Sequence, residues 1–227
     1  MTQSIIPEEG KVIFINKELR WTSFDVVKKI RNLVRIKKVG HAGTLDPLAT
    51  GLLIICVGKM TKQINSFMNL EKEYAGTMII GKTTPSVDLE TEINSERSIE
   101  HITKEDVIKT SLKFHGKLMQ VPPIYSALKK DGEPLYKKAR KGEKVSIEPR
   151  EVESKEFEIT KVNLPEVHFR LVCSKGFYVR SLVHDFGEDL GVGAYMSKLE
   201  RTRIGEHKLE NSLTIDEFRK SIEDANS

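Results

Sequence analysis

The chain has 227 residues, of which 38% are hydrophobic and 31% charged. This composition is typical of a soluble globular protein with one substantial domain or two small ones. No apolar run approaches the roughly 20 residues of a membrane span, and the first ten residues lack the order of a signal peptide. Cys56 and Cys173 stand apart in apolar stretches, which predicts buried thiols in a reducing compartment. We therefore expect a cytoplasmic protein.

The net charge is only +4, but it is unevenly distributed along the chain. Residues 26–45 hold six Lys or Arg and no acid, and residues 121–150 hold eight against four acids. Residues 86–106 reverse the balance, with seven acids against two bases. This distribution suits a protein that docks a polyanion on one side, although each block alone is as readily explained as a solvated surface.

The first third of the chain contains a strand, a helix and a long loop. Residues 11–16 alternate weakly and predict a strand. The run from Thr22 to Asp25 has the form of a capping box, and the apolar spacing after it predicts a helix over 23–35. Residues 36–50 are too rich in Gly and Pro for regular structure, so we expect a loop.

The remaining elements follow from the same patterns, and residues 81–98 are expected to form an acidic surface loop. Residues 116–150 combine prolines, turns and scattered lysines, which indicates an excursion from the core with one helix near 134–141. The other predicted strands are residues 52–57, 74–80, 152–162, 167–173 and 197–204. The other predicted helices are residues 61–69, 103–114, 178–190 and 215–223.

Three motifs that suggest other chemistries fail on inspection. Ser126 and Lys129 fit Ser-x-x-Lys, but the partner motifs of acyl-transfer enzymes are absent. The run from Gly51 to Lys59 has the wrong spacing for a phosphate loop. The six histidines are dispersed and form no metal-ligand pattern. We expect no metal and no cofactor.

The informative stretch is the loop from Gly40 to Gly51, which reads GHAGTLDPLATG. A plain turn explains its glycines and Pro47, but it explains less easily a lone acid in a basic segment. A carboxylate among cations is held ionised, and an ionised carboxylate serves as a nucleophile or base. The residues alone make Asp46 a candidate catalytic group.

This loop resembles the signature of the TruB family of pseudouridine synthases, Gly-His-x-Gly-x-Leu-Asp-Pro-x-Ala-x-Gly, at every specified position. Lys72–Tyr74 and Ser174–Arg180 are similar to two further family elements, and Pro122–Lys129 is similar to the start of the family's RNA-gripping thumb. The resemblance runs from about Val12 to Gly205. It implies an α+β pseudouridine synthase fold, with a central mixed, mostly antiparallel sheet flanked by helices and loops and an inserted thumb arm.

The resemblance also implies a domain organisation. We expect one catalytic domain over residues 1–227, with the thumb at about 117–150 and no C-terminal PUA domain of the kind that many bacterial relatives carry. Such a chain is expected to lack contacts with the acceptor stem. Phe177 stands where the family pattern has Thr, and we expect this difference to be tolerated.

The activity that the resemblance implies is isomerisation of uridine 55 in the tRNA T-loop to pseudouridine. The stacked base must be flipped out before any side chain reaches it. Asp46 corresponds to the catalytic aspartate that attacks the target nucleotide, and Arg180 would pair with it. Tyr74 would stack on the flipped uracil, replacing base stacking worth about 1–3 kcal/mol.

The remaining residues carried over from the family contact the RNA. Tyr178 and Leu199 would line the uracil pocket, and His41 would pack against the reorganised RNA loop. Taken singly, the tyrosines are more often core aromatics, Arg180 is more often a surface helix residue, and His41 would be a solvated loop residue. The basic blocks would grip phosphates. The lysines expected to bind RNA are Lys37, Lys38, Lys62, Lys129 and Lys130.

Two alternative functions compete with a stand-alone enzyme. One is a tRNA-folding chaperone, in which RNA binding matters more than modification. The other is a synthase that acts within a guide-RNA complex, which the compact length disfavours. We expect a monomer with the tRNA T-stem-loop as its partner and with no obligate protein partner.

Overall fold

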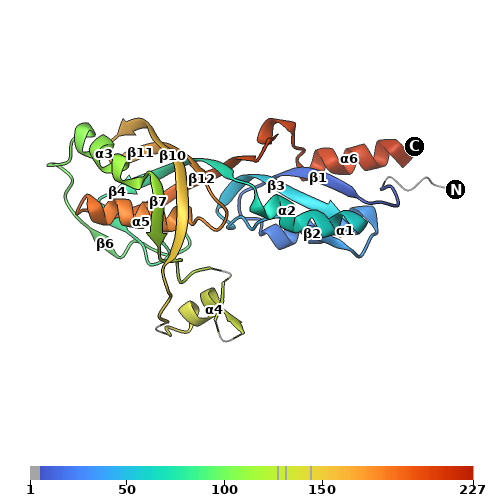
Figure 1. Ribbon diagram of the computed structural model, residues 1–227, viewed down its shortest axis with the longest axis horizontal. Coiled ribbons are helices and arrows are strands. Elements are labelled where there is room, and N and C mark those ends of the chain that lie inside the picture. Colours follow the sequence, from blue (N-terminus) through green and yellow to red (C-terminus); the bar gives the residue numbers. More distant parts are fainter. Residues whose placement is uncertain (1–5, 127, 131, 144, 227) are drawn as a thin grey trace. The chain divides into compact units, whose positions relative to one another are not determined.

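The computed structural model describes residues 6–126, 128–130, 132–143 and 145–226, without the side chains of residues 129, 130, 140 and 226. The chain divides into two compact units (Figure 1): unit 1 comprises Met1–Ala75 with Leu199–Ser227, and unit 2 comprises Gly76–Lys198. This division does not decide whether residues 1–227 act as one catalytic domain, which stays a prediction. Within the described ranges, no helix combines the length and apolar character that a membrane span requires.

A mixed sheet runs through the protein in the order β1-β3-β12-β4-β11-β10-β7, with β2 beside β3 and β13 beside β12. Its strands are β1 (Lys11–Lys17), β2 (Val39–His41), β3 (Ala49–Val57), β4 (Lys72–Ile80), β7 (Gly116–Gln120), β10 (Arg150–Asn163), β11 (Glu166–Cys173), β12 (Ala194–Ile204) and β13 (His207–Lys208). Strands β3 and β12 run parallel, whereas the pairs β1–β3, β10–β11 and β10–β7 are antiparallel. The predicted mixed, mostly antiparallel sheet is confirmed.

Unit 1 is built around strand β3, which is buried on both faces. Leu53, Ile55 and Val57 pack in one cluster with the apolar sides of α1 (Ser23–Val34) and α6 (Ile215–Asn226). The alternate residues, Leu52 and Ile54, pack in a second cluster with residues of η1 (Gly58–Gln63), α2 (Ile64–Asn69) and η3 (Leu209–Asn211). A strand that is covered on both faces has a continuous run of apolar residues, and this is why the run LLIICV at residues 52–57 predicted a strand.

Unit 2 packs helices α3 (Lys104–Ser111) and α5 (Val179–Asp189) with its part of the sheet. Four phenylalanines form its aromatic centre. Phe157 lies 5.7 Å from Phe169, 6.0 Å from Phe186 and 6.3 Å from Phe114, which belongs to η2 (Leu112–Phe114). Strands β5 (Lys82–Thr83) and β6 (Ser95–Glu96) form a separate two-stranded pair. Aromatic contacts of this kind supply much of a small core's burial.

Between β7 and β10 the chain leaves the sheet of unit 2, as Figure 1 shows, and carries β8 (Lys129–Lys130), β9 (Glu133–Pro134) and α4 (Leu135–Arg140). We call residues 121–149 the arm. The prediction of an excursion with one helix near 134–141 is confirmed. The excursion begins later than predicted, because residues 116–120 form β7, whose pairing with residues 150–154 no local pattern reveals.

Most other predicted elements are confirmed within a few residues, including helices 23–35 and 215–223 and strand 52–57. Two further predictions were wrong in detail, and the surface loop predicted over 81–98 contains β5 and β6. The helix predicted over 61–69 is a 3₁₀ segment followed by a short α-helix. The loop predicted over 36–50 contains β2, because residues 39–41 pair with Ile55–Val57. Such pairing is a tertiary effect that overrides local punctuation.

Candidate active site

The candidate catalytic loop, residues 40–51, runs from the end of β2 through a turn into the start of β3, within unit 1. After Asp46 it turns tightly, because the Asp46 carbonyl accepts a hydrogen bond of 3.0 Å from the Ala49 amide. Gly51 has φ +103°, and a Cβ there would lie 2.4 Å from the Arg201 carbonyl oxygen. Only glycine fits such a position, since it combines a left-handed backbone with close approach of another strand. The glycine of the signature therefore sets how the loop joins β3.

Ser23 fixes the residue before Asp46. Its buried hydroxyl donates to the Leu45 carbonyl at 3.1 Å and accepts from the Leu45 amide at 2.9 Å. Ser23 is the first residue of α1, directly after the cap Thr22. One hydroxyl thus satisfies both polar groups of a buried loop residue, which ties the loop to the start of the helix.

Arg201, on β12, donates hydrogen bonds to backbone carbonyls near both ends of the same loop. Its side chain is buried, with 1% of the residue exposed. The Nε atom donates to the Leu52 carbonyl at 2.8 Å, and the Nη2 atom donates to the Gly43 carbonyl at 3.1 Å. The planar fork of a guanidinium can hold several carbonyls in one geometry, so Arg201 sets the shape of the loop around Asp46.

Lys17, the last residue of β1, is fully buried beneath the loop. Its Nζ atom donates to the Trp21 carbonyl at 2.6 Å, the Glu18 carbonyl at 3.0 Å and the Pro47 carbonyl at 3.4 Å. Burial lowers the pKa of Lys17 to about 8, and the nearby negative charge of Asp46 acts in the opposite direction. Because this attraction is mutual, the Lys17 cation favours the ionised carboxylate.

The other candidates in unit 1 lie on strands. His41 ends β2, and its burial, with the positive charge of Arg201, lowers the pKa of its ring, so it is neutral at pH 7. Tyr74 on β4 and Leu199 on β12 are each 8% exposed. Leu199 lies opposite Ala49 of the signature in the sheet register. Their roles toward RNA stay predictions.

In unit 2, Arg180 is the second residue of α5 and is 3% exposed. Its guanidinium donates to the Tyr125 carbonyl at 2.7 Å and the Ser86 carbonyl at 3.2 Å, and lies 3.6 Å from an Asp88 oxygen. Sequence reasoning missed Asp88, because residues 81–98 were expected to form a surface loop. Ser86 and Asp88 are in fact buried, at 1% and 3% exposed. The pairing of Arg180 with Asp46 stays a prediction.

Tyr178 is the N-cap residue of α5, and one neighbouring side chain binds both its backbone amide and its backbone carbonyl. The Gln120 side chain donates to its carbonyl at 2.9 Å and accepts from its amide at 2.8 Å. The Arg150 guanidinium lies 4.8 Å from the centre of the tyrosine ring, a cation–π arrangement. Phe177 beside it is buried, at 9% exposed, so an apolar side chain suits this position.

The lysines predicted to bind RNA are surface residues where their side chains are described. Lys37 and Lys38 follow α1, and Lys62 lies in η1; all three are exposed. Lys129 and Lys130 form β8, and their side chains lie outside the described residues. Among the described residues, no group of three or more His, Cys, Asp or Glu could hold a metal ion.

Comparison with known proteins agrees with the motifs. The family described as TruB family pseudouridylate synthase (N terminal domain) matches residues 31–179, and the tRNA pseudouridylate synthase B C-terminal domain matches residues 180–226. The chain is 49% identical to the tRNA pseudouridine synthase B of Flavobacterium johnsoniae, over 95% of this chain and 97% of that protein. It is 48% identical to the protein of the same name from Phocaeicola vulgatus, over 93% and 92% of the two chains.

Solved structures show the same fold. A chain of a Cbf5-Nop10-Gar1 complex matches with a TM-score of 0.73 and 28% identity over 97% of this chain. A chain of the archaeal box H/ACA sRNP Nop10-Cbf5 complex matches with a TM-score of 0.70 and 25% identity over 95% of this chain. This chain spans just over half the length of those two chains, 57% and 54%.

Proposed function

Because the chain belongs to the TruB family of pseudouridylate synthases, we propose that it converts uridine 55 in the T-loop of tRNA to pseudouridine. The observation that carries this proposal is identity of 48–49% with tRNA pseudouridine synthases B across almost the whole of both chains. The Asp46 loop of the signature, held by buried donors, is the local counterpart of that similarity. The substrate is tRNA, and the proposed location is the cytoplasm, where tRNA resides.

The reaction is an isomerisation that balances without a cofactor. The bond from uracil N1 to ribose C1′ breaks, the uracil turns, and a bond from C5 to C1′ forms. The hydrogen at C5 leaves as a proton, and N1 gains one. The base must be flipped out of the T-loop first. Asp46 attacks the target nucleotide as an ionised carboxylate, a role that the buried Lys17 cation supports.

The other proposed roles follow from side-chain type and position. Tyr74 stacks on the flipped uracil, Tyr178 and Leu199 line its pocket, and Arg180 pairs with Asp46. The neutral ring of His41 packs against bases displaced in the RNA loop. Phosphates are bound by Lys37, Lys38 and Lys62, which are exposed, and by Lys129 and Lys130 of the arm.

The rigidity of the catalytic loop supports chemistry rather than binding alone. Ser23, Lys17 and Arg201 make six hydrogen bonds of 3.5 Å or less with the backbone of residues 43–52, five to carbonyls and one from the Leu45 amide. A nucleophile reacts faster when its position is set before the substrate binds, because the entropy cost of ordering it has already been met. A protein that only refolds tRNA needs no loop held in this way.

The test is tritium release from tRNA labelled at uridine C5, with wild type and Asp46→Asn compared. We expect about one equivalent per tRNA from wild type alone, and none when uridine 55 is replaced. Tight tRNA binding by a folded wild type without release would instead favour the tRNA-folding chaperone. Activity on free tRNA without added protein or guide RNA would show that the proposed monomer needs no obligate protein partner and no guide-RNA complex.

A further inference from the structure

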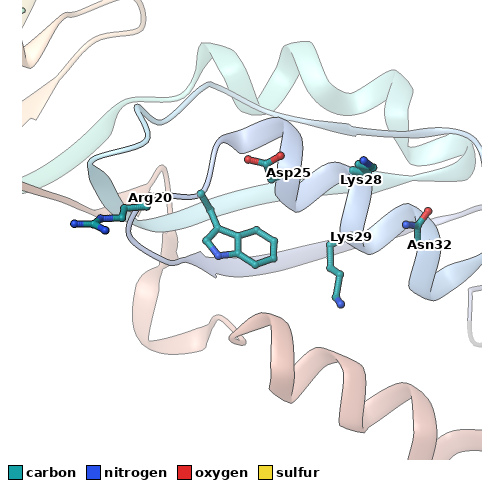
Figure 2. A pocket seen from close by; sticks show the side chains of 6 residues that line it. Arg20, Asp25, Lys28, Lys29 and Asn32 are labelled. Atoms are coloured by element: carbon teal, nitrogen blue, oxygen red, sulfur yellow. The ribbon is translucent and has the colours of Figure 1, made fainter. Parts of the chain in front are cut away.

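Unit 1 carries an open pocket beside α1, lined by Arg20, Trp21, Asp25, Lys28, Lys29 and Asn32, with a volume of about 370 Å³. We call it the Trp21 pocket. Figure 2 shows Asp25, Lys28 and Asn32 along one side of α1 and Arg20 on the segment that precedes the helix. The sequence had marked residues 26–45 as a basic block, but the roles assigned to the candidate residues leave this part of the block unused.

The pocket is electropositive. Arg20, Lys28 and Lys29 are exposed cations. The single acid, Asp25, is occupied: its Oδ2 atom accepts hydrogen bonds from the Thr22 amide at 2.9 Å and the Thr22 hydroxyl at 2.6 Å. The three cations and one carboxylate leave the lining with a net charge of +2. An anion in the pocket therefore meets a net positive charge.

The pocket also offers an aromatic surface. Trp21 is half-buried, because part of its ring packs against the core of unit 1, and the rest lines the pocket. An indole anchored in this way needs no ordering when a ring stacks on it. Leu19 and Phe24, which flank this segment in the sequence, are 53% and 61% exposed. A fixed aromatic ring among cations suits a nucleotide, because the cations can bind its phosphate and its base can stack on the ring.

The pocket wall is bonded directly to the catalytic loop. The Arg20 amide donates to the Pro47 carbonyl at 2.7 Å, one residue beyond Asp46. The buried Lys17 amine donates hydrogen bonds to both the Trp21 and the Pro47 carbonyls, and so links the pocket to the loop. An RNA strand whose uridine reaches Asp46 continues on both sides of that uridine. The Trp21 pocket is therefore placed where a neighbouring part of the strand can enter it.

Arg20 adds a backbone argument. Its φ of +69° lies in the left-handed region, where glycine is relaxed and a side chain is strained. Strained backbone persists where the surroundings enforce it and tends to accompany function. Here the bond from its amide to Pro47 enforces the conformation, and an arginine occupies a position where glycine would be more stable.

We infer that the Trp21 pocket binds a nucleotide of the substrate tRNA other than the target uridine. Its phosphate lies against Arg20, Lys28 and Lys29, and its base or ribose lies on Trp21. The identity of this ligand rests on the proposed function. The same charges fit an acidic peptide less well, because a peptide leaves the aromatic face without a matching ring.

The first experiment measures affinity for full-length unmodified tRNA as a function of salt, in an Asp46→Asn background that prevents turnover. Lys28→Glu combined with Lys29→Glu should weaken binding and lower the slope of log affinity against log salt by about one for each phosphate that the variant no longer neutralises. Lys220→Glu on α6 is the matched control, because it reverses an exposed lysine of unit 1 outside the pocket. The control should leave both quantities unchanged.

The second experiment separates stacking from folding. Trp21→Leu keeps an apolar side chain against the core but removes the aromatic face, so affinity should fall about 5- to 150-fold, and Trp21→Phe should recover most of the loss. Arg20→Gly should raise the melting temperature, because it relieves the left-handed strain, and yet weaken tRNA binding. A residue with a purely structural role is not expected to raise the melting temperature and weaken tRNA binding in the same variant.

Failure of this inference is distinguishable from failure of the proposed function. Wild type that releases tritium, together with pocket variants that bind tRNA with unchanged affinity and salt slope, would overturn the inference alone. Wild type that releases none would overturn the proposed function, while the binding comparison still decides whether the pocket holds RNA.

Discussion

The candidate catalytic loop and the arm are both segments that the family resemblance assigns to RNA, but they are held by different means. The loop is fixed from inside by Ser23, Lys17 and Arg201, whose buried side chains bond its backbone. The outer part of the arm carries two-residue strands and a six-residue helix, with an exposed ion pair of 2.9 Å between Lys141 and Glu133. Buried bonds are costly to lose, whereas surface pairs contribute little.

The base of the arm resembles the loop rather than the outer arm. Arg180 donates to the Tyr125 carbonyl at 2.7 Å, and Ser181 donates to the Val121 carbonyl at 2.7 Å. The start of α5 therefore anchors the point where the arm leaves the sheet. Among the described residues, the candidate catalytic loop is therefore held by buried donors, and the arm has such donors where it leaves the sheet.

The largest expected effect is that of Asp46→Asn. We expect turnover to fall on the order of 10⁴-fold or more, because the amide cannot act as the attacking carboxylate. Affinity for tRNA should stay nearly unchanged. Tritium release and fluorescence anisotropy measure the two quantities. Loss of binding with an intact fold would mean that the loop serves recognition rather than chemistry.

Asp88→Asn tests the anchor at the arm's base. Both Asp88 and Arg180 are buried, so removing the carboxylate leaves the guanidinium without this partner. We expect a loss of about 3–5 kcal/mol in unfolding free energy. Thermal melting would register this as a clear fall in midpoint, and Glu92→Gln, an exposed acid of the same segment, provides the control. Equal midpoints for the two variants would refute the anchor.

Ser23→Ala tests the interior support of the loop. The Leu45 amide and carbonyl both lose their bond to the hydroxyl, which should cost about 2 kcal/mol. Turnover should fall more than tRNA affinity, because Asp46 is the next residue. Chemical denaturation and single-turnover kinetics give the two numbers, with exposed Ser66→Ala as the matched control. An unchanged turnover would show that the loop holds its shape without this hydroxyl.

Lys17→Met tests the buried cation through pH. The folded pKa of about 8 lies below the unfolded value near 10.5, so from pH 8 to 10.5 the unfolded chain binds more protons at this site. The Lys17 contribution to stability therefore rises with pH across this window, by at most about 1.4 kcal/mol per unit. Below pH 8 the buried charge is a full cost. The wild-type minus Lys17→Met difference in unfolding free energy should climb accordingly, and a flat difference would contradict the burial argument.

The smallest effect belongs to the outer arm. Glu133→Gln removes the exposed pair with Lys141, and we expect no measurable change in melting midpoint, because solvent and salt screen such pairs. A differential scanning measurement at low and high salt checks this. A shift as large as that of Ser23→Ala would erase the distinction between the loop and the outer arm.

How much of the site could be predicted depends on the range of the interaction. The capping box of Thr22 and Asp25 was predicted because its bonds span three residues. Arg201 was missed because it bonds the Leu52 carbonyl 149 positions away. Lys17 left a signal: it continues the inward alternation of Ile13 and Ile15 on β1, so it occupies a buried register position. Asp88 left none, because an acidic segment is ordinarily a solvated one.

The sequence by itself determined the family, the signature loop with Asp46, the capped start of α1 and the apolar strand β3, because local patterns and motifs encode these features. The tertiary structure alone decided which carbonyls Ser23, Lys17 and Arg201 hold, that Asp88 is buried with Arg180, and that Arg20, Trp21 and the lysines of α1 line one pocket. Burial and pairing between distant segments depend on how the chain packs, and no local spacing specifies them.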